Sequence, residues 1–300
     1  MTKHYESAQA FKTSLEARFR TRSKEHGVSI QTLQLRFTIE RLLARLFHDP
    51  DPIWLLKGGF AMDLRFRPRA RTTRDVDLSI PLVPPPSEAG LLVDLQKLLQ
   101  MAADIDLNDH MSFYFGEAQH ELTNAPAGGA RFLCEARLAG KVYSRFHLDV
   151  GCGDVPTSRP EQLTGDDILS FAGVEPAVVL AIPKSQQFAE KIHAYSFPWT
   201  DRENTRTRDL VDMLMMIERS PPDVDETREA IRATFGTRDS HPIPPRLNVP
   251  PTSWEREFAR MALEAGLSTT DYLVAFERVA AFWTANSLNP ESPPPDTEIP

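Results

Sequence analysis

The 300-residue sequence has only two cysteines and no long apolar run. Two thiols, Cys134 and Cys152, cannot build a disulfide framework, and their spacing matches no metal-binding motif. A membrane-spanning helix needs about 20 apolar residues, and no segment approaches this length. The N-terminal stretch also lacks the apolar region of a secretory signal. We therefore expect a soluble, cytoplasmic protein without membrane association.

Basic residues are scarce beyond the first quarter of the chain. The formal net charge is −8, yet residues 1–74 hold 15 Lys and Arg against 7 Asp and Glu. Such a basic segment suits a polyanion, while the overall acidity disfavours indiscriminate coating of nucleic acid. A solvated helical surface is the alternative explanation. Five arginines crowd the end of this segment: Arg65, Arg67, Arg69, Arg71 and Arg74.

The spacing of apolar residues predicts a first part that mixes helices with strands and a second part that is helical. Helices are expected at 7–26, 29–48, 60–66 and 88–102, and strands at 53–56, 75–80, 111–118, 131–138 and 142–150. Further helices are expected at 184–196, 206–218, 224–234, 254–265 and 269–285.

This pattern predicts an α+β fold, in which a mixed sheet core with flanking helices precedes a helical C-terminal region. Proline and glycine cluster at 160–183, which favours a domain boundary there. We expect one domain at 1–170 with the N-terminal helices and the sheet core, and a helical domain at 171–288. The proline-rich, acidic tail at 289–300 is expected to be disordered.

Two aspartates stand one residue apart on the strand expected at 75–80. Side chains of a strand alternate between its faces, so Asp75 and Asp77 should share a face while Val76 and Leu78 face the core. Carboxylates placed in this way bind Mg²⁺ together with the phosphates of a substrate. In nucleotidyl transfer, such an ion offsets charge on the attacking and leaving oxygens. Two solvent-facing aspartates on an edge strand are the alternative.

The tripeptide Lys57-Gly58-Gly59 joins a short apolar run to a predicted helix. Glycine lets the backbone approach a ligand closely, and a helix N-terminus presents backbone N–H groups to an anion. A Gly-Gly pair alone is usually a simple turn. Followed by a helix and then by Asp-x-Asp on a strand, it favours a phosphate site beside a metal site.

The stretch LLKGGFAMDLRFRPRARTTRDVDLSI resembles the signature of the DNA polymerase β-like nucleotidyltransferase superfamily. More closely, it resembles the AbiEii/AbiGii toxin family of toxin–antitoxin systems, which includes the mycobacterial MenT toxins. Two later stretches, FAEKIHAYS and TRDLVDMLMM, resemble the lysine helix and the following acidic helix of that family. The resemblance runs through residues 53–218 and implies a nucleotidyltransferase-like fold.

The resemblance also implies a role for each matching residue. Nucleotide-binding roles fall on Lys57, Gly58, Gly59, Arg74 and Lys191. Roles in binding Mg²⁺ or Mn²⁺ fall on Asp75, Asp77 and Asp149, the last as a third carboxylate from a later strand. Catalytic roles fall on Asp75, Asp77, Lys191 and Asp209.

Several of these assignments have alternatives. Asp149 is otherwise an ordinary aspartate at the end of a strand. Asp209 acts as a base or positions the acceptor, and Asp212, at i+3 on much the same helix face, is hard to rank against it. Without the resemblance, Lys191 is a solvated lysine and Asp212 forms a surface ion pair with Arg208.

As a function, the resemblance implies a metal-dependent toxin that transfers a nucleotide from an NTP, with the 3′ end of tRNA as acceptor. It also implies a separately encoded antitoxin as partner. Transfer to a small molecule or a protein side chain is the alternative enzyme. A non-catalytic module that binds a nucleotide or a partner is a third candidate. Phe60 motivates it, because relatives commonly carry Ser or Thr there, whose hydroxyl contacts phosphate.

Overall fold

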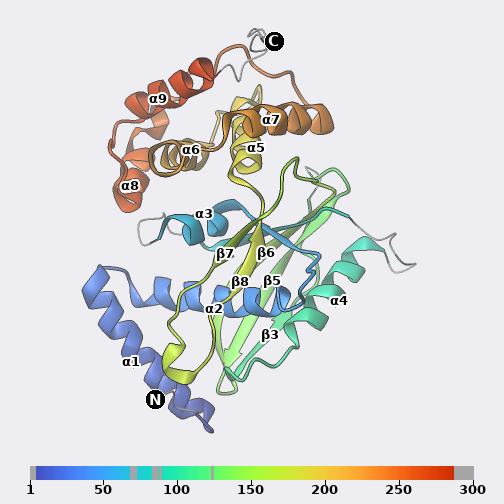
Figure 1. Ribbon diagram of the computed structural model, residues 1–300, viewed down its shortest axis with the longest axis vertical. Coiled ribbons are helices and arrows are strands. Elements are labelled where there is room, and N and C mark those ends of the chain that lie inside the picture. Colours follow the sequence, from blue (N-terminus) through green and yellow to red (C-terminus); the bar gives the residue numbers. More distant parts are fainter. Residues whose placement is uncertain (1–4, 68–72, 83–86, 88–89, 123–124, 287–300) are drawn as a thin grey trace, which may run out of the picture. The chain divides into compact units, whose positions relative to one another are not determined.

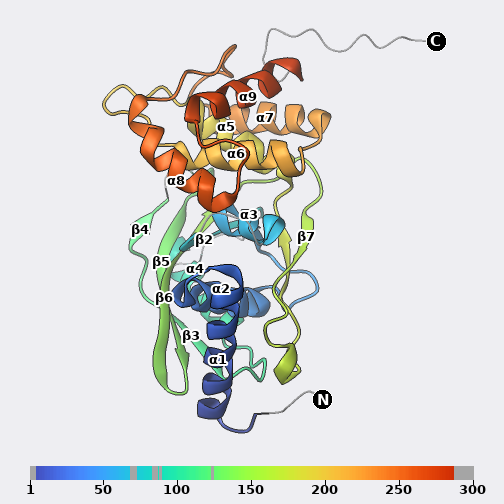
Figure 2. The ribbon, with the colours of Figure 1, turned by 90° about the vertical axis from the view of Figure 1, so that its left-hand side faces the viewer.

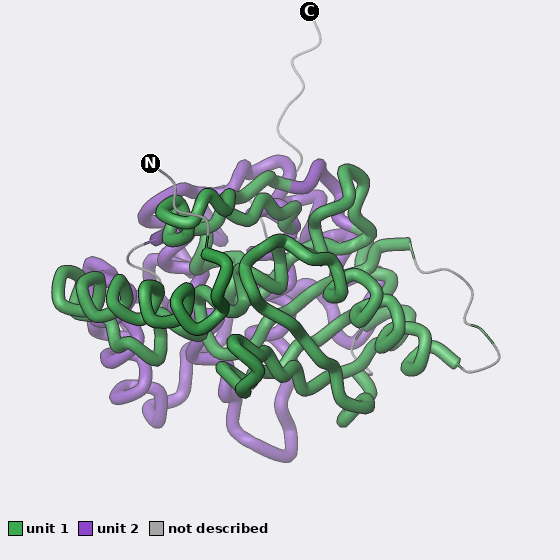
Figure 3. The backbone as a smooth tube through the Cα atoms, turned by 90° about the horizontal axis from the view of Figure 1, so that it is seen from below, with its two compact units in different colours: residues 1–65, 72–155, 161–181 green, residues 66–71, 156–160, 182–300 purple. Residues whose placement is uncertain are grey.

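A computed structural model of the protein describes residues 5–67, 73–82, 87, 90–122 and 125–286. The chain forms two compact units, which Figure 3 distinguishes by colour. Unit 1 comprises residues 1–65, 72–155 and 161–181, and unit 2 comprises residues 66–71, 156–160 and 182–300. Arg69, Arg71, the start of the helix expected at 88–102 and the tail at 289–300 lie outside the described residues.

Unit 1 is built on an eight-stranded mixed sheet with the order β3-β5-β6-β2-β1-β8-β7, and β4 pairs with β5 outside this path. The pairs β1–β8 and β2–β6 are parallel, whereas β5 and β6 form a long antiparallel hairpin (Figure 2). This sheet confirms the expected fold class. The strands are β1 Leu55–Lys57, β2 Asp75–Ile80, β3 Met111–Phe115, β4 His120–Glu121, β5 Gly129–Leu138, β6 Lys141–Cys152, β7 Glu161–Thr164 and β8 Val178–Ala181.

Helices cover the apolar face of this sheet. Helix α2 contacts β6 and β8, while α4 contacts β3 and β5 (Figure 1). Val76 and Leu148 are fully buried in a core that also contains Leu42 of α2. Asp75 and Asp77 are only partly buried, as the two-residue period of a strand predicts. The helices of unit 1 are α1 Ala8–His26, α2 Ile30–Leu46, α3 Gly58–Phe66 and α4 Leu91–Ala103.

Two arginines of α2 anchor the segment that precedes β3. Arg41 Nε donates to Asp109 Oδ2 at 2.7 Å, and Arg45 Nη2 donates to Asp109 Oδ1 at 2.6 Å. All three side chains are buried. Since an isolated charge is costly away from water, the two guanidiniums are what allows this carboxylate to be buried.

Unit 2 is helical. Helix α5 contacts α6 and α7, and α6 contacts α8 and α9. The apolar stripe predicted for 184–196, Phe188, Ile192 and Tyr195, is buried as expected. No helix in the described residues is long and apolar enough to cross a membrane. The helices are α5 Lys184–Ser196, α6 Thr207–Arg219, α7 Val224–Arg238, α8 Glu255–Ala265 and α9 Tyr272–Ala285, with short 3₁₀ turns at Ser170–Ala172 in unit 1 and Thr252–Trp254.

Strands β7 and β8 lie in the proline- and glycine-rich segment that favours a domain boundary in the sequence. Each has four residues, too few to show a convincing alternation. Pairing decides their conformation instead, because β7 and β8 form an antiparallel ladder with each other, and Ala181 of β8 also lies opposite Leu56 of β1 in a parallel ladder. The division between the units therefore falls after Ala181, later than the boundary expected at residue 170.

Candidate active site

Four charged residues form a row across four neighbouring strands of unit 1. Lys57 of β1 lies opposite Asp77 of β2, Asp77 opposite Asp149 of β6, and Asp149 opposite Arg131 of β5. Residues paired across strands place their side chains on the same face of a sheet. The structure thus brings together Lys57, Asp77 and Asp149, and adds Arg131. We call Lys57, Asp77, Asp149 and Arg131 the charge row.

The first turn of α3 lies against the carboxylate of Asp77. Helix α3 begins at Gly58, whose φ of +66° favours glycine, and a Cβ atom added there would overlap Asp77 Oδ2. Gly59 follows in the same turn and is buried. Because the N-terminal end of a helix carries partial positive charge and directed N–H groups, an anion is stabilised at this place.

Asp75 lies on the same face as Asp77, next to His147 of β6. Its Oδ1 atom is 3.8 Å from His147 Nδ1, and its side chain is 40% exposed. Two accessible carboxylates on one face suit Mg²⁺ or Mn²⁺, which also takes oxygen ligands from phosphate and water. In the described residues, no group of three or more His, Cys, Asp or Glu side chains is placed to hold a metal ion.

Asp149 is engaged by a partner that the sequence analysis did not identify. Arg131 Nε donates to Asp149 Oδ1 and Arg131 Nη2 donates to Asp149 Oδ2, both at 2.7 Å. This is the two-pronged geometry that guanidinium and carboxylate favour. The hydrogen bond to Asp149 and the negative charges of Asp149, Asp75 and Asp77 raise the pKa of Arg131, although burial opposes the shift.

Lys57 also has a partner that the sequence did not indicate. Its Nζ atom donates to Asp154 Oδ2 at 3.0 Å. The ammonium group lies close to Gly151 of β6, where an added Cβ would be in ordinary van der Waals contact with Lys57 Nζ at 3.7 Å. The charge row therefore ends in a lysine whose charge is partly offset by Asp154. Asp154 lies two residues beyond the end of β6.

Three other expected residues differ in their surroundings. Arg74 is exposed immediately before β2. Arg65 is buried and its Nε donates to Glu161 Oε2 at 2.9 Å, so this member of the arginine group serves the packing of unit 1. Burial lowers the pKa of Arg65 against the opposing effect of Glu161. Phe60 is fully buried in the hydrophobic core, so the residue after Gly-Gly has a packing role.

In unit 2, a lysine is held between two aspartates of the next helix. Lys191 Nζ of α5 lies 2.7 Å from Asp212 Oδ2 and 3.0 Å from Asp209 Oδ1 of α6. Lys191 is 8% exposed and Asp212 is fully buried. The alternatives of a solvated lysine and of a surface pair between Asp212 and Arg208 are therefore wrong. Asp209 keeps 14% of its side chain exposed, which ranks it as the more accessible acid.

The loop between α5 and α6 carries an aromatic and basic cluster that the sequence analysis missed. The rings of Phe197 and Trp199 are 4.9 Å apart, and the Arg202 guanidinium lies 4.2 Å from the Trp199 ring centre. Arg206 lies 6.0 Å from the same ring centre and 3.9 Å from Asp209. We call Phe197, Trp199, Arg202 and Arg206 the loop cluster. Its signal in the sequence is the run FPWTDRENTR.

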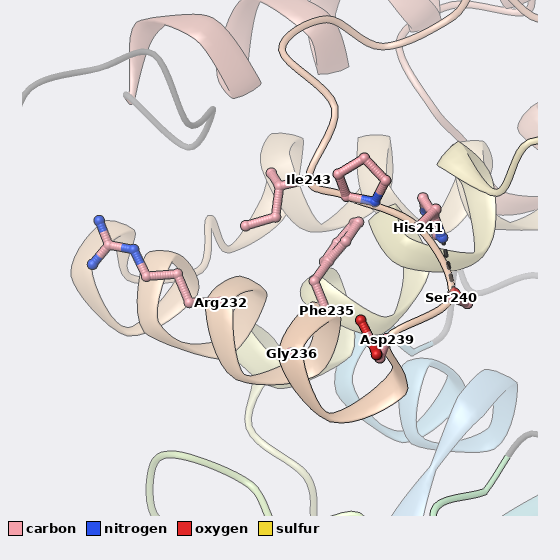
Figure 4. Close-up of a pocket in the computed structure, with 8 residues that line it drawn as sticks. Arg232, Phe235, Gly236, Asp239, Ser240, His241 and Ile243 are labelled. Atoms are coloured by element: carbon pink, nitrogen blue, oxygen red, sulfur yellow. Dashed lines mark hydrogen bonds between the residues drawn. The ribbon is translucent and has the colours of Figure 1, made fainter.

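A pocket of about 540 Å³ lies elsewhere in unit 2, at the end of α7 (Figure 4). Within it, Ser240 Oγ and His241 Nδ1 are hydrogen-bonded at 2.9 Å. None of the expected site residues lines this pocket. Its lining consists of Arg232, Phe235, Gly236, Asp239, Ser240, His241, Pro242 and Ile243.

Comparisons with known proteins identify the family and the fold of the chain. The family model of the nucleotidyl transferase AbiEii toxin, of type IV toxin–antitoxin systems, matches residues 41–285. The solved structure of MenT4, a nucleotidyltransferase toxin from Mycobacterium tuberculosis, is 16% identical and covers 90% of this chain and 97% of its own, with a TM-score of 0.56. A putative nucleotidyltransferase from H. pylori is 10% identical, covers 86% and 96%, and has a TM-score of 0.45. Among curated proteins, none matches.

The matched residues extend from α2 to α9 and include the charge row as well as Lys191, Asp209 and Asp212. The similarity to MenT4 supports the fold described above. An NTP as substrate and an antitoxin as partner follow from the family. The chain belongs to the AbiEii family of nucleotidyltransferase toxins.

Proposed function

We propose that this toxin transfers a nucleoside monophosphate from an NTP to the 3′ end of tRNA. The oxygen of the terminal hydroxyl forms a bond to the α-phosphorus, the bond to the β-phosphate breaks, and pyrophosphate leaves. The hydroxyl proton passes to a base. An added nucleotide blocks aminoacylation, so translation stops, and a tRNA acceptor means that the reaction takes place in the cytoplasm.

The observation that carries the proposal is the contact between Asp77 and the first turn of α3. At this place carboxylates and a helix N-terminus adjoin, so a divalent ion and the phosphates it binds are both stabilised. Mg²⁺ or Mn²⁺ held by Asp75 and Asp77 would supply positive charge to the reacting phosphate and the leaving pyrophosphate. The backbone of Gly58 and Gly59 binds the triphosphate, and Arg74 adds an exposed positive charge beside Asp75.

Two lysines are proposed to bind phosphate. Lys57, at the end of the charge row, is held by its hydrogen bond to Asp154. Lys191 is held in place by Asp212, whose complete burial suits an anchoring role. Asp209 retains exposure and shares the same lysine, so we assign it to the acceptor hydroxyl as base or positioning group.

The loop cluster supports an RNA acceptor. Stacking of bases on aromatic rings, together with arginines for the phosphates, is how proteins bind single-stranded nucleic acid. Trp199 and Phe197 provide such rings, and Arg206 links the cluster to Asp209. An unpaired 3′ end of RNA fits these groups better than a small molecule, which needs an enclosed pocket.

The test is the fate of a label from each of the four NTPs, labelled at the α-phosphate. Purified protein is incubated with MgCl₂ and a mixture of total tRNA, bacterial protein extract and small metabolites, and the three fractions are separated. We expect label in the tRNA fraction, removed by RNase and confined to the 3′ terminus. Label that remains with protein or with small molecules would mean that the acceptor is a protein or a small molecule and not tRNA.

A further inference from the structure

The pairing of Arg131 with Asp149 uses every oxygen of a carboxylate that stands beside the metal-binding aspartates. Both Asp149 oxygens accept hydrogen bonds of 2.7 Å from one guanidinium. Asp149 lies directly opposite Asp77 in the parallel ladder between β2 and β6. A divalent ion at Asp77 would thus find the neighbouring carboxylate already neutralised. Arginine remains protonated in proteins, so this neutralisation is permanent.

An irregularity in the β5–β6 hairpin puts Arg131 in this position. The register shifts by one residue between Ala136 and Arg137, and beyond the shift Arg131 lies opposite Asp149. Without the shift Arg131 would face Leu148, whose side chain lies on the buried face. Because a slip of one residue exchanges the two faces of a strand, the bulge is what delivers this guanidinium to the charge row.

The charges around the row balance without a second ion. Asp75, Asp77 and Asp149 bring three negative charges to one face, and Arg131 senses all three. Arg131 offsets one of them at the β5 side. The remaining two belong to Asp75 and Asp77, which a single divalent ion would neutralise.

On the basis of the proposed function, we propose that Arg131 withdraws Asp149 from the metal-binding set and presents its remaining N–H groups to the active site. One divalent ion, held by Asp75 and Asp77, then suffices. Asp149 is a positioning residue for Arg131, and the N–H groups of Arg131 that Asp149 does not use donate to the phosphates of the bound NTP.

Binding of Mn²⁺ alone, followed through the electron paramagnetic resonance signal of the free ion, tests this proposal. We expect one Mn²⁺ per wild-type chain and a loss of affinity of at least ~10-fold in Asp77→Asn, which removes a ligand. The double variant Arg131→Met/Asp149→Asn should bind Mn²⁺ within about three-fold of wild type, because neither residue is a ligand and the net charge is kept. Arg131→Met alone should bind about ten-fold more tightly, since it frees a carboxylate.

A matched control lies in the same hairpin. Arg145 and Arg137 both donate to the carboxylate of Glu135. Arg145→Met/Glu135→Gln therefore removes one charge of each sign from an exposed cluster away from the charge row. It should leave Mn²⁺ binding unchanged. Nucleotide transfer should fall at least ~100-fold in Arg131→Met/Asp149→Asn and stay within about three-fold in the control, since only the first removes N–H donors that face the phosphates. Thermal unfolding of each variant verifies folding.

The outcomes separate this proposal from the proposed function. If Arg131→Met/Asp149→Asn lost Mn²⁺ affinity as Asp77→Asn does, Asp149 would be a metal ligand. That result would overturn this inference but would leave the proposed metal site of the enzyme standing. Two ions bound to wild type, or unchanged affinity in Arg131→Met, would overturn it as well. Full transfer activity in Arg131→Met/Asp149→Asn would show that Arg131 does not act on the phosphates of the NTP. Mn²⁺ binding that is indifferent to Asp77→Asn would overturn the metal site itself.

Discussion

The carboxylate of Asp77 lies directly against the backbone of Gly58, so closely that a Cβ atom at Gly58 would overlap Asp77 Oδ2. The glycine also has a φ of +66°, which L-residues with side chains rarely adopt. Conformation and space therefore both require glycine at the first residue of α3. This contact joins the helix end that we propose to bind phosphate to the strand that we propose to bind a metal ion, and it is the structural basis of the proposed reaction.

Gly58→Ala should abolish activity through this contact. The added methyl group must displace Asp77 or the start of α3, and a misplacement of that size costs about 100-fold in rate. Gly27→Ala is the matched control, because Gly27 has a φ of +67° but nothing within 4 Å of an added Cβ. Both variants should lose about 1–2 kcal/mol in unfolding free energy from the left-handed backbone. Urea denaturation and nucleotide transfer check this, and equal activity of the two variants would contradict it.

Lys191 should affect stability and activity in separable ways. Lys191→Met removes the ammonium between Asp209 and Asp212 and should lower the unfolding free energy by about 3 kcal/mol, because a carboxylate stays buried. Lys191→Met/Asp212→Asn should recover most of that loss, yet transfer no nucleotide. Chemical denaturation and a transfer assay measure the two effects. A double variant that regained activity would reduce Lys191 to a structural role.

The buried Asp109 should make unit 1 sensitive to acid. Burial alone would raise the pKa of Asp109, but hydrogen bonds and charges from Arg45 and Arg41 outweigh it, so the pKa is lowered. A lowered folded-state pKa stabilises the protein above the unfolded-state value, about 3.9, and this contribution is lost as the pH falls through the folded-state value. Asp109→Asn should cost about 3 kcal/mol near neutral pH, and less below about pH 4. Urea midpoints across this range measure it, and a difference independent of pH would count against it.

Trp199 should contribute to RNA binding and leave nucleotide binding alone. Removal of one stacking ring costs about 1–3 kcal/mol, so Trp199→Ala should raise the Kd for a single-stranded RNA by about 5- to 150-fold. Tyr114→Ala is the control, since Tyr114 is exposed and lies 4.8 Å from Arg137 in a similar ring–guanidinium contact on β3. Fluorescence anisotropy with labelled RNA measures both. Equal effects of the two substitutions would exclude a specific role for the loop cluster.

The sequence predicts those parts of the site that follow from local periodicity. Asp75 and Asp77 share a face because strand side chains alternate, and the helix expected at 60–66 forms, although it begins two residues earlier, at Gly58. The stripe of α5 likewise predicts its buried face. What a helical pattern cannot reveal is the partner of a polar residue. Lys191 is compatible with a solvated position until Asp212, twenty-one residues later, is brought beside it.

Non-local pairing determines the rest. The turn at Gly140 suggests that Arg131 and Asp149 lie near each other, but a regular hairpin would place Arg131 opposite Leu148. Only the bulge near Ala136 brings the two charges together, and no residue type in that stretch predicts the bulge. Strand β8 shows the same limit, because its four residues become a strand by pairing with β7 and, at Ala181, with β1.

The most direct test of the proposed transfer to tRNA compares wild type with Asp77→Asn. Both proteins are incubated with Mg²⁺, tRNA and α-labelled nucleotide. The substitution keeps the size of the side chain beside Gly58 and removes only its charge. We expect a label at the tRNA 3′ end with wild type and at least ~1,000-fold less with the variant, because the proposed metal ligand is lost. Equal labelling of tRNA by both proteins, or no labelling by wild type with any of the four NTPs, would contradict it.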